Sequence, residues 1–362
     1  MWLRLLIILG SLSLFPVPAA ARDLVLLLHS ESNPSAWTQD VATGLTAELN
    51  DSADVRQIFL QARSMDEDAF DDVFERLSQE LAGVTPLAVV ANGETAFAFA
   101  RKYGDDLFPG AAVIFCSMGR PDTRVLTQSG NCTGIPMEFD LKGSVDLIFS
   151  MCPGINLVVA IADASHSATP LMEDVRLAMQ QYTDRAQIMF PGFEPGDDNG
   201  LDVKTLAETL SSVPSSGAVL FLGFAEDREG NPVSDEELSG LFRSHGTSPI
   251  FVVRDAWPDS GVLGGWMISG RTIGRDAARL VTRIGQGEAV QEMLPEPTRP
   301  ELRFDGTALT RFGLKAPPGA EITNQPVRHV VDESALPVSG LAWVFGLAAL
   351  VALLYGIRRY RA

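Results

Sequence analysis

The chain has 362 residues, of which 46% are hydrophobic and 20% are charged, a composition typical of a globular protein with room for two domains. Its 46 acidic and 28 basic residues give a formal net charge of -18, a surface that repels phosphate backbones and argues against nucleic-acid binding. We interpret the acidic surface as one that keeps the protein soluble.

The N-terminus has the pattern of a secretory signal peptide. Arg4 precedes an apolar run from Leu5 to Val17, and the alanines at 19–21 supply the small residues of a cleavage site. The run is too short for a good membrane span, which takes about 20 apolar residues. The sequence therefore predicts that residues 1–21 are removed and that the rest of the chain is exported.

Short apolar runs alternate with amphipathic segments of helix length through the middle of the chain. In the first half we expect strands at 24–28, 55–60, 87–91 and 111–115, and helices at 36–49, 66–81 and 94–103. In the second half we expect strands at 157–162, 187–190, 218–222 and 250–253, and helices at 140–150, 171–182, 203–210, 235–242 and 271–284. This alternation predicts an α/β protein in which each half is a parallel sheet with flanking helices.

Two successive halves of similar size predict two lobes with a cleft between them. We place lobe 1 at 22–137, with part of 265–290 returning to it, and lobe 2 at 138–264. Prolines become frequent after Gly287, so 288–337 is predicted to be an extended connector. Ligands of such sheets bind outside the carboxyl ends of the strands, and a cleft between lobes is a common small-molecule site.

The C-terminus has the pattern of a membrane anchor. Residues 338–357 carry no charge and are long enough to cross the hydrocarbon core, and three arginines follow in the tail 358–362. Since positive residues stay on the cytoplasmic side, we predict a single-pass transmembrane helix that holds the body on the periplasmic or extracytoplasmic face. Leu336–Gly340 also resembles a sortase or exosortase sorting signal, so the segment is either an anchor or a processed signal.

The cysteines and histidines give little support for metal binding or catalysis. Cys116, Cys132 and Cys152 form no CxxC motif, and either one bridge between the first two or three thiols is compatible with the sequence. Ser165 and His166 are adjacent, which is not how a nucleophile and its base usually meet. Because GxSxG, P-loop and GxGxxG motifs are also missing from the sequence, we predict a protein that is not an enzyme and uses no metal or cofactor.

Four stretches carry a resemblance to a known family: Leu27–Thr38, Asn92–Ser117, Phe221–Asn231, and Gly264–Gly270 with Arg303–Gly313. In order and spacing they are similar to the TrpX-like substrate-binding proteins of ABC transporters, which also occur as periplasmic sensor domains of histidine kinases. The resemblance implies a two-lobed type I periplasmic-binding fold. The chain departs from the sensor kinases because its tail is too short for a signalling domain, and from lipid-anchored members because no cysteine lies near the cleavage site.

Polar and aromatic residues at the ends of the expected strands are the candidate ligand contacts. Hydroxyls, amides and carboxylates at strand ends can fix a polar ligand, and aromatic rings give a flat apolar surface. The candidates are Ser30, Trp37, Thr38, Asn92, Gly93, Glu94, Ser117, Asp163, Phe224, Asp255 and Trp257.

The sequence therefore predicts a membrane-tethered binding protein for a small extracytoplasmic molecule, acting in solute uptake or ligand sensing. Its partner would be an ABC permease or a sensor kinase, reached when ligand shifts the lobes toward a closed state. Two alternatives stay open. One is a surface-displayed interaction protein that binds no small ligand, and the other is an exported hydrolase.

Overall fold

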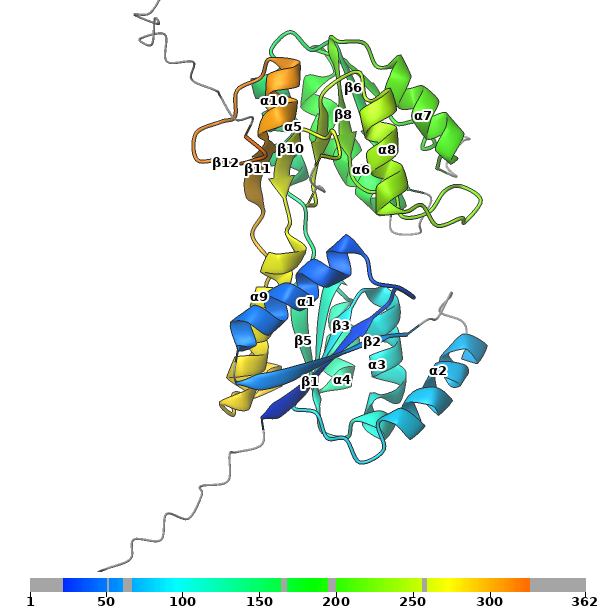
Figure 1. Cartoon of the computed structure of the whole chain (residues 1–362), viewed down its shortest axis with the longest axis vertical. Helices are drawn as coiled ribbons and strands as arrows, with labels where there is room; N and C mark the ends of the chain where they lie inside the picture. The colour runs from blue at the N-terminus through cyan, green and yellow to red at the C-terminus, as the bar shows by residue number, and fades with distance from the viewer. Residues whose placement is uncertain are drawn as a thin grey trace, which may run out of the picture. The chain divides into compact units, whose positions relative to one another are not determined.

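A computed structural model describes residues 22–325 apart from 51, 61–66, 164–167, 195–199 and 256–258 (Figure 1). The described residues up to Asn324 belong to one compact unit. The predicted signal peptide, transmembrane helix and cytoplasmic tail lie outside the described residues. Among the helices that are described, none combines the length and the apolar character that a bilayer crossing needs.

The first sheet is entirely parallel, with strand order β2-β1-β3-β4-β5. Val25 to Leu28 and all five residues of β3 are buried, as expected of strands that are covered on both faces. Its strands are β1 (Asp23–His29), β2 (Ala53–Phe59), β3 (Ala88–Asn92), β4 (Ala112–Met118) and β5 (Cys132–Pro136).

Helices pack on both faces of this sheet and make two separate cores. One core joins β1 to α2 and α3, with Leu26, Phe70 and Phe99 among its buried residues. The other joins the opposite face of β1 to α1 and α9, with Val25 and Ile273 among them. The helices of this lobe are α1 (Ala36–Leu49), α2 (Glu67–Glu80), α3 (Glu94–Leu107), α4 (Thr123–Ser129) and α9 (Gly270–Gly285).

Helices α1 and α9 lie side by side in Figure 1, and two glycines bring their backbones together. A Cβ atom on Gly44 would lie 2.0 Å from the carbonyl oxygen of Arg271, and one on Gly274 would lie 2.0 Å from that of Val41. Any larger residue would force the helices apart. This contact fixes α9, late in the sequence, on the lobe formed by the first part of the chain.

The second sheet has strand order β12-β11-β10-β9-β8-β6-β7, and only the β10–β11 pair is antiparallel. Its strands are β6 (Leu157–Ile161), β7 (Gln187–Met189), β8 (Gly217–Phe221), β9 (Ile250–Val252), β10 (Gly264–Met267), β11 (Glu301–Asp305) and β12 (Glu321–Thr323). Its helices are α5 (Leu141–Met151), α6 (Ala168–Met179), α7 (Val203–Ser212), α8 (Asp235–His245) and α10 (Gly306–Phe312), with a single 3₁₀ turn at Gln180–Tyr182. A second 3₁₀ turn, Val290–Glu292, packs on the first lobe, where Val290 is buried in the core.

The prediction of an extended connector from residue 288 is wrong between Glu301 and Thr323. This stretch holds β11, α10 and β12, which complete the second sheet. Phe304 is fully buried and Leu309 is 6% exposed, so the segment contributes to the core of that lobe. The prolines before Glu301 mark one of the segments by which the chain passes from the first lobe to the second.

Candidate functional site

The carboxyl ends of the strands bring several predicted site residues together. The first sheet reverses its strand order between β1 and β3, and the second reverses between β6 and β8. Ligands of open α/β sheets bind outside the strand ends at such reversals. Ser30 and Gly93 follow β1 and β3, and Asp163 and Gly223 follow shortly after β6 and β8. Each lobe therefore presents one switch point with polar residues.

Ser30 and Gly93 form a helix start. The Ser30 hydroxyl accepts a hydrogen bond from the backbone N–H of Ala96 in the first turn of α3, at 2.9 Å. Gly93 has φ +97°, and a Cβ atom there would lie 2.5 Å from the Ser30 Oγ. Ser30 thus replaces the missing cap side chain of α3, and Glu94 is the exposed first residue of that helix.

Asn92 belongs to a buried polar cluster with His29. Its amide nitrogen lies 2.9 Å from His29 Nδ1, and the other ring nitrogen lies 3.2 Å from Gln57 Oε1. Burial lowers the pKa of His29 from 6.5 to about 4, against the opposing effect of the hydrogen bond to Gln57. The ring is therefore neutral at physiological pH, and it stacks on Phe59 with 4.5 Å between centroids.

The nearby thiol of Cys116 completes this cluster. Its sulfur lies 3.8 Å from Asn92 Oδ1, and Cys116 and Cys132 are both buried free thiols. The sequence left open either a bridge between Cys116 and Cys132 or three thiols, and the structure has three free thiols, including Cys152. Burial raises the pKa of Cys116 and of Cys132 to about 12, so both stay protonated and unreactive at neutral pH.

Trp37 is held as a rigid platform. Its indole N–H donates a hydrogen bond of 3.1 Å to the Ser117 hydroxyl. Ser117 has a positive φ of +57° and lies at a register shift between β4 and β5. This irregular backbone turns its hydroxyl toward the Trp37 indole. Gly270 lies against the ring, since a Cβ atom there would be 3.3 Å from Trp37 Cε3. Thr38, next in sequence, is fully buried and forms a capping box with Ser35, which is a structural role.

Arg254 is the site residue that the sequence prediction missed. It follows β9, and its guanidinium carbon lies 5.7 Å from the centroid of the Trp37 ring. A Cβ atom on Gly223 would lie 2.8 Å from Arg254 Nη2, so the guanidinium also rests on the backbone after β8. The only signal in the sequence is its position directly after the buried run Ile250–Val253.

Three carboxylates act electrostatically on the Arg254 guanidinium. Burial lowers the pKa of Arg254, and the negative charges of Asp163, Asp235 and Glu31 oppose that shift. Asp163 also accepts a hydrogen bond of 3.1 Å from the backbone N–H of Ala225, which fixes it at the end of β6. Arg254, Trp37 and Asp163 therefore join the strand ends of both sheets in one polar and aromatic site.

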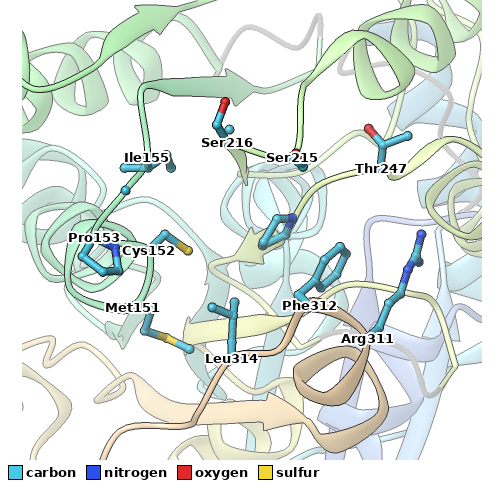
Figure 2. A pocket seen from close by; sticks show the side chains of 13 residues that line it. Met151, Cys152, Pro153, Ile155, Ser215, Ser216, Thr247, Arg311, Phe312 and Leu314 are labelled. Atoms are coloured by element: carbon cyan, nitrogen blue, oxygen red, sulfur yellow. The ribbon is translucent and has the colours of Figure 1, made fainter.

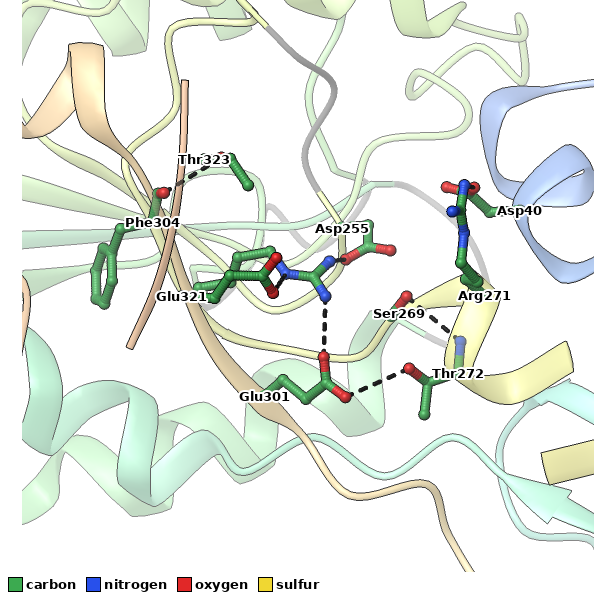
Figure 3. Close-up of polar contacts among 10 residues, drawn as sticks. Asp40, Asp255, Ser269, Arg271, Thr272, Glu301, Phe304, Glu321 and Thr323 are labelled. Carbon is green, nitrogen blue, oxygen red and sulfur yellow. Dashed lines mark hydrogen bonds and ion pairs between the residues drawn. The ribbon is translucent and has the colours of Figure 1, made fainter. Parts of the chain in front are cut away.

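Asp255 is brought into an ion-pair cluster instead. Arg303 reaches Asp255 at 2.8 Å, Glu301 at 2.9 Å and Glu321 at 2.9 Å (Figure 3). Burial raises the pKa of Asp255, while a hydrogen bond with Ser269 and the charge of Arg303 lower it. This cluster lies where the chain passes between the lobes, at the start of α9 and of β11.

The candidate Phe224 does not join the site. Phe224 is 1% exposed and packs in the core of the second lobe with residues such as Leu238 and Val252. Trp257 lies outside the described residues. Among the residues that are described, no group of three or more His, Cys, Asp or Glu side chains is placed to hold a metal ion.

The second lobe also has a cavity of about 530 Å³ at the opposite end of its sheet. It is bordered by residues just before β6, β8 and β9 and by the end of α10, and none of the predicted site residues lines it (Figure 2). Met151, Phe312 and Leu314 point into it together with the polar Ser216 and Thr247.

Two α/β lobes, each with a parallel sheet and linked by crossing segments, define the type I periplasmic-binding fold. Solved structures of that class are similar to this chain. A conserved domain protein from Vibrio cholerae O1 biovar El Tor is 14% identical, with a TM-score of 0.57, and covers 83% of this chain and 99% of its own. An ABC domain from Streptococcus pneumonia in complex with L-Trp is 13% identical, with a TM-score of 0.58 and coverages of 84% and 100%.

A ligand-free, open substrate-binding protein with adhesive properties from Clostridium difficile is 10% identical, with a TM-score of 0.54 and coverages of 84% and 100%. No protein-family model matches the sequence, and no curated protein matches it significantly. At these identities the likeness establishes the fold alone.

Proposed function

We propose that this chain is an extracytoplasmic solute-binding protein that holds a small molecule at the Trp37–Arg254 site. The observation that carries the proposal is the approach of Arg254 to within 5.7 Å of the Trp37 ring. It places groups from the strand ends of both sheets at one point, where ligands of this architecture bind. Because Trp37 belongs to the first lobe and Arg254 to the second, a ligand there contacts both.

The site contains the types of group that small-molecule sites use. Trp37 offers an aromatic face, Ser117 a hydroxyl, and Arg254 and Asp163 opposite charges. Ligand would stabilise the lobe arrangement in which these groups act together, through its higher affinity for that state. Solute-binding proteins of ABC transporters share the fold, which supports this function over an unrelated one.

The location and partner belong to the same proposal. The residues at 1–21 would direct export, and those at 338–357 would hold the body at the outer face of the cell membrane. The response would pass to a membrane partner, either an ABC permease or a sensor kinase. The fold is shared with solute-binding proteins, and the sequence contains none of the catalytic motifs GxSxG, P-loop and GxGxxG. Both observations support binding rather than catalysis.

A thermal-shift screen tests the proposal on the full chain in mild detergent, with amino acids, sugars, nucleosides and aromatic acids as probes. A ligand at about 100 times its Kd stabilises the folded form by about 2.7 kcal/mol, which raises Tm by about 4 °C for a protein of this size.

The shift should vanish in Trp37→Ala and persist in Phe312→Ala, which alters the cavity at the other end of the second sheet. If no probe raises Tm, or if the shift depends on Phe312 and not on Trp37, the proposal fails.

A further inference from the structure

We propose that a hydrogen-bonded chain of side chains across the first sheet positions the Trp37 platform for its ligand. We call this set the polar chain, and its members, in the order of the strands, are Gln57, His29, Asn92 and Cys116. The inference rests on the proposed function, because it concerns the same site. It gives Asn92, which the sequence predicts as a ligand contact, a positioning role instead.

The polar chain crosses the sheet from strand to strand. Gln57 lies on β2, His29 ends β1, Asn92 ends β3 and Cys116 lies on β4. His29 Nε2 lies 3.2 Å from Gln57 Oε1, and His29 Nδ1 lies 2.9 Å from the amide nitrogen of Asn92. The Cys116 sulfur lies 3.8 Å from Asn92 Oδ1. Each contact joins two neighbouring strands, so the polar chain ties four strands together near their carboxyl ends.

The chemistry of these groups fixes the direction of each hydrogen bond. The amide nitrogen of Asn92 can only donate, so His29 Nδ1 accepts and the ring proton lies on Nε2. Nε2 then donates to Gln57 Oε1, which can only accept. At the other end, the Cys116 thiol donates to Asn92 Oδ1. This arrangement needs a neutral ring, and burial, which lowers the pKa of His29 to about 4, keeps it neutral at physiological pH.

The polar chain is shielded from water over most of its length. His29 and Cys116 are fully buried, and Asn92 is 4% exposed. Among the described residues, no buried side-chain nitrogen or oxygen lacks a hydrogen-bond partner. A buried network that is fully satisfied holds its members in one arrangement, because any other leaves a donor or an acceptor unpaired.

Cys116 connects the polar chain to the platform. It pairs in register with Asn92, and its carbonyl oxygen accepts the N–H of Gly93 at 2.9 Å. The next residue, Ser117, has φ +57°, which is costly for any residue with a Cβ atom and persists only where the surroundings hold it. Its hydroxyl accepts the Trp37 indole N–H at 3.1 Å. We therefore assign to Cys116 the role of holding Ser117 where it meets the indole.

The same side chains also precede two other predicted site positions. Ser30 directly follows His29, and Gly93 directly follows Asn92. The backbone N–H of Ser30 donates to the carbonyl oxygen of Asn92 at 3.0 Å. The polar chain therefore lies behind the whole edge that the first lobe contributes to the site.

NMR on the full chain in detergent micelles, with isotope-labelled tryptophan and histidine, gives a readout that needs no ligand. The indole signal of Trp37 is the one that is missing from Trp37→Phe, and its hydrogen exchange with solvent reports the bond to Ser117. Ser117→Ala should speed this exchange at least about fivefold, the factor that corresponds to the loss of one neutral hydrogen bond.

Cys116→Ala tests whether the polar chain acts on this bond. It should speed the Trp37 exchange at least about twofold, because residues in one network are coupled by that factor or more. Cys116→Ser keeps a donor for Asn92 and should restore the wild-type rate. The matched control is Cys132→Ala, which truncates another buried thiol of the same lobe, 3.9 Å from the Thr133 carbonyl oxygen, and should leave the rate unchanged.

The histidine signals test the direction of the polar chain in the same samples. The His29 ring is identified by its loss in His29→Gln, and its nitrogen chemical shifts should place the proton on Nε2. Asn92→Asp removes the donor to Nδ1 and should also speed the Trp37 exchange, so it replaces Cys116→Ala if that variant does not fold. Equal exchange in Cys116→Ala and Cys132→Ala, or a His29 proton on Nδ1, would overturn the inference.

The outcomes separate this inference from the proposed function, because none of these measurements involves a ligand. If the exchange rates follow the expected pattern but no probe stabilises the chain, the polar chain stands and the solute-binding function is wrong. If a probe raises Tm but Cys116→Ala exchanges like wild type, the function stands and the positioning role is wrong.

Discussion

Arg303 on β11 holds the carboxylate of Asp255, at the end of β9, at a distance of 2.8 Å. Only 22% of the Arg303 side chain and 17% of the Asp255 side chain are exposed, so this pair is better shielded than the surface ion pairs of the chain. Asp255 directly follows the site residue Arg254, and Arg303 also reaches Glu321 on β12. The pair thus ties the strand that ends at the proposed site to the last described strand.

Arg303→Met should lower the free energy of unfolding by about 3 kcal/mol at neutral pH, since it leaves a shielded carboxylate without its partner. The loss should shrink in acid, where Asp255, whose pKa is already raised by burial, becomes protonated and needs no partner. Urea unfolding at several pH values measures both effects. Arg124→Met breaks an exposed pair with Asp122 and should cost less than about 1 kcal/mol. If both variants lose the same free energy of unfolding, the Arg303–Asp255 pair is no more stabilising than an exposed pair.

Gly44→Ala should destabilise the first lobe by about 1–3 kcal/mol, because the added methyl group meets the Arg271 carbonyl oxygen at 2.0 Å and overpacks the α1–α9 contact. The matched control is Gly240→Ala in α8, where nothing lies within 4 Å of the new Cβ atom. There the change should stabilise by about 0.5–1 kcal/mol, because alanine favours a helix. Thermal unfolding of both variants and of the wild type measures these changes. If Gly44→Ala does not lower the stability, the close contact between α1 and α9 is contradicted.

The alternation of apolar runs and amphipathic segments was enough to predict two α/β lobes, because strands buried on both faces leave long apolar runs such as Val25 to Leu28. Strands without such a run were missed. β10 begins with Gly264 and Gly265, which have φ +116° and +157° and approach the carbonyl oxygens of Arg303 and Val252. Glycines weaken the local strand signal, and only the tertiary contacts explain them.

The site was predictable only where a residue type and a strand end coincided. Trp37, Ser117 and Asp163 were predicted in this way, and their role as ligand contacts stays a prediction. Arg254 was missed because its role depends on Trp37, which is far away in sequence and in the other lobe. Phe224 was predicted at a strand end, but its ring is buried in the core of the second lobe, which sequence position alone does not reveal.

His29 should make stability depend on pH in a defined window. The unfolded chain takes up a proton near pH 6.5, whereas the folded chain does so only at about pH 4. Stability from this residue is therefore fully present above pH 6.5 and is lost as the pH falls toward 4. The full effect is about 3 kcal/mol, from about 1.4 kcal/mol per pKa unit.

His29→Gln removes the titrating group while keeping polar atoms near Asn92 and Gln57. The difference in unfolding free energy between wild type and variant should therefore narrow as the pH is lowered through this window. A difference that stays constant with pH would show that His29 is not held neutral. Denaturant unfolding at matched ionic strength makes the comparison, and His245→Gln, at a partly exposed histidine beside Ser211, is the control.

Ser30→Ala should separate a capping role from a ligand contact. The hydroxyl accepts the Ala96 N–H at 2.9 Å, and loss of a cap of this kind costs about 1 kcal/mol. We expect a lower Tm without ligand and an unchanged ligand-induced shift, because the platform of Trp37 and Ser117 is intact. Ser117→Ala is the matched comparison: it frees the indole N–H and should reduce the shift more than it reduces stability. If Ser30→Ala leaves Tm unchanged but removes the shift, Ser30 is a ligand contact and the cap is incidental.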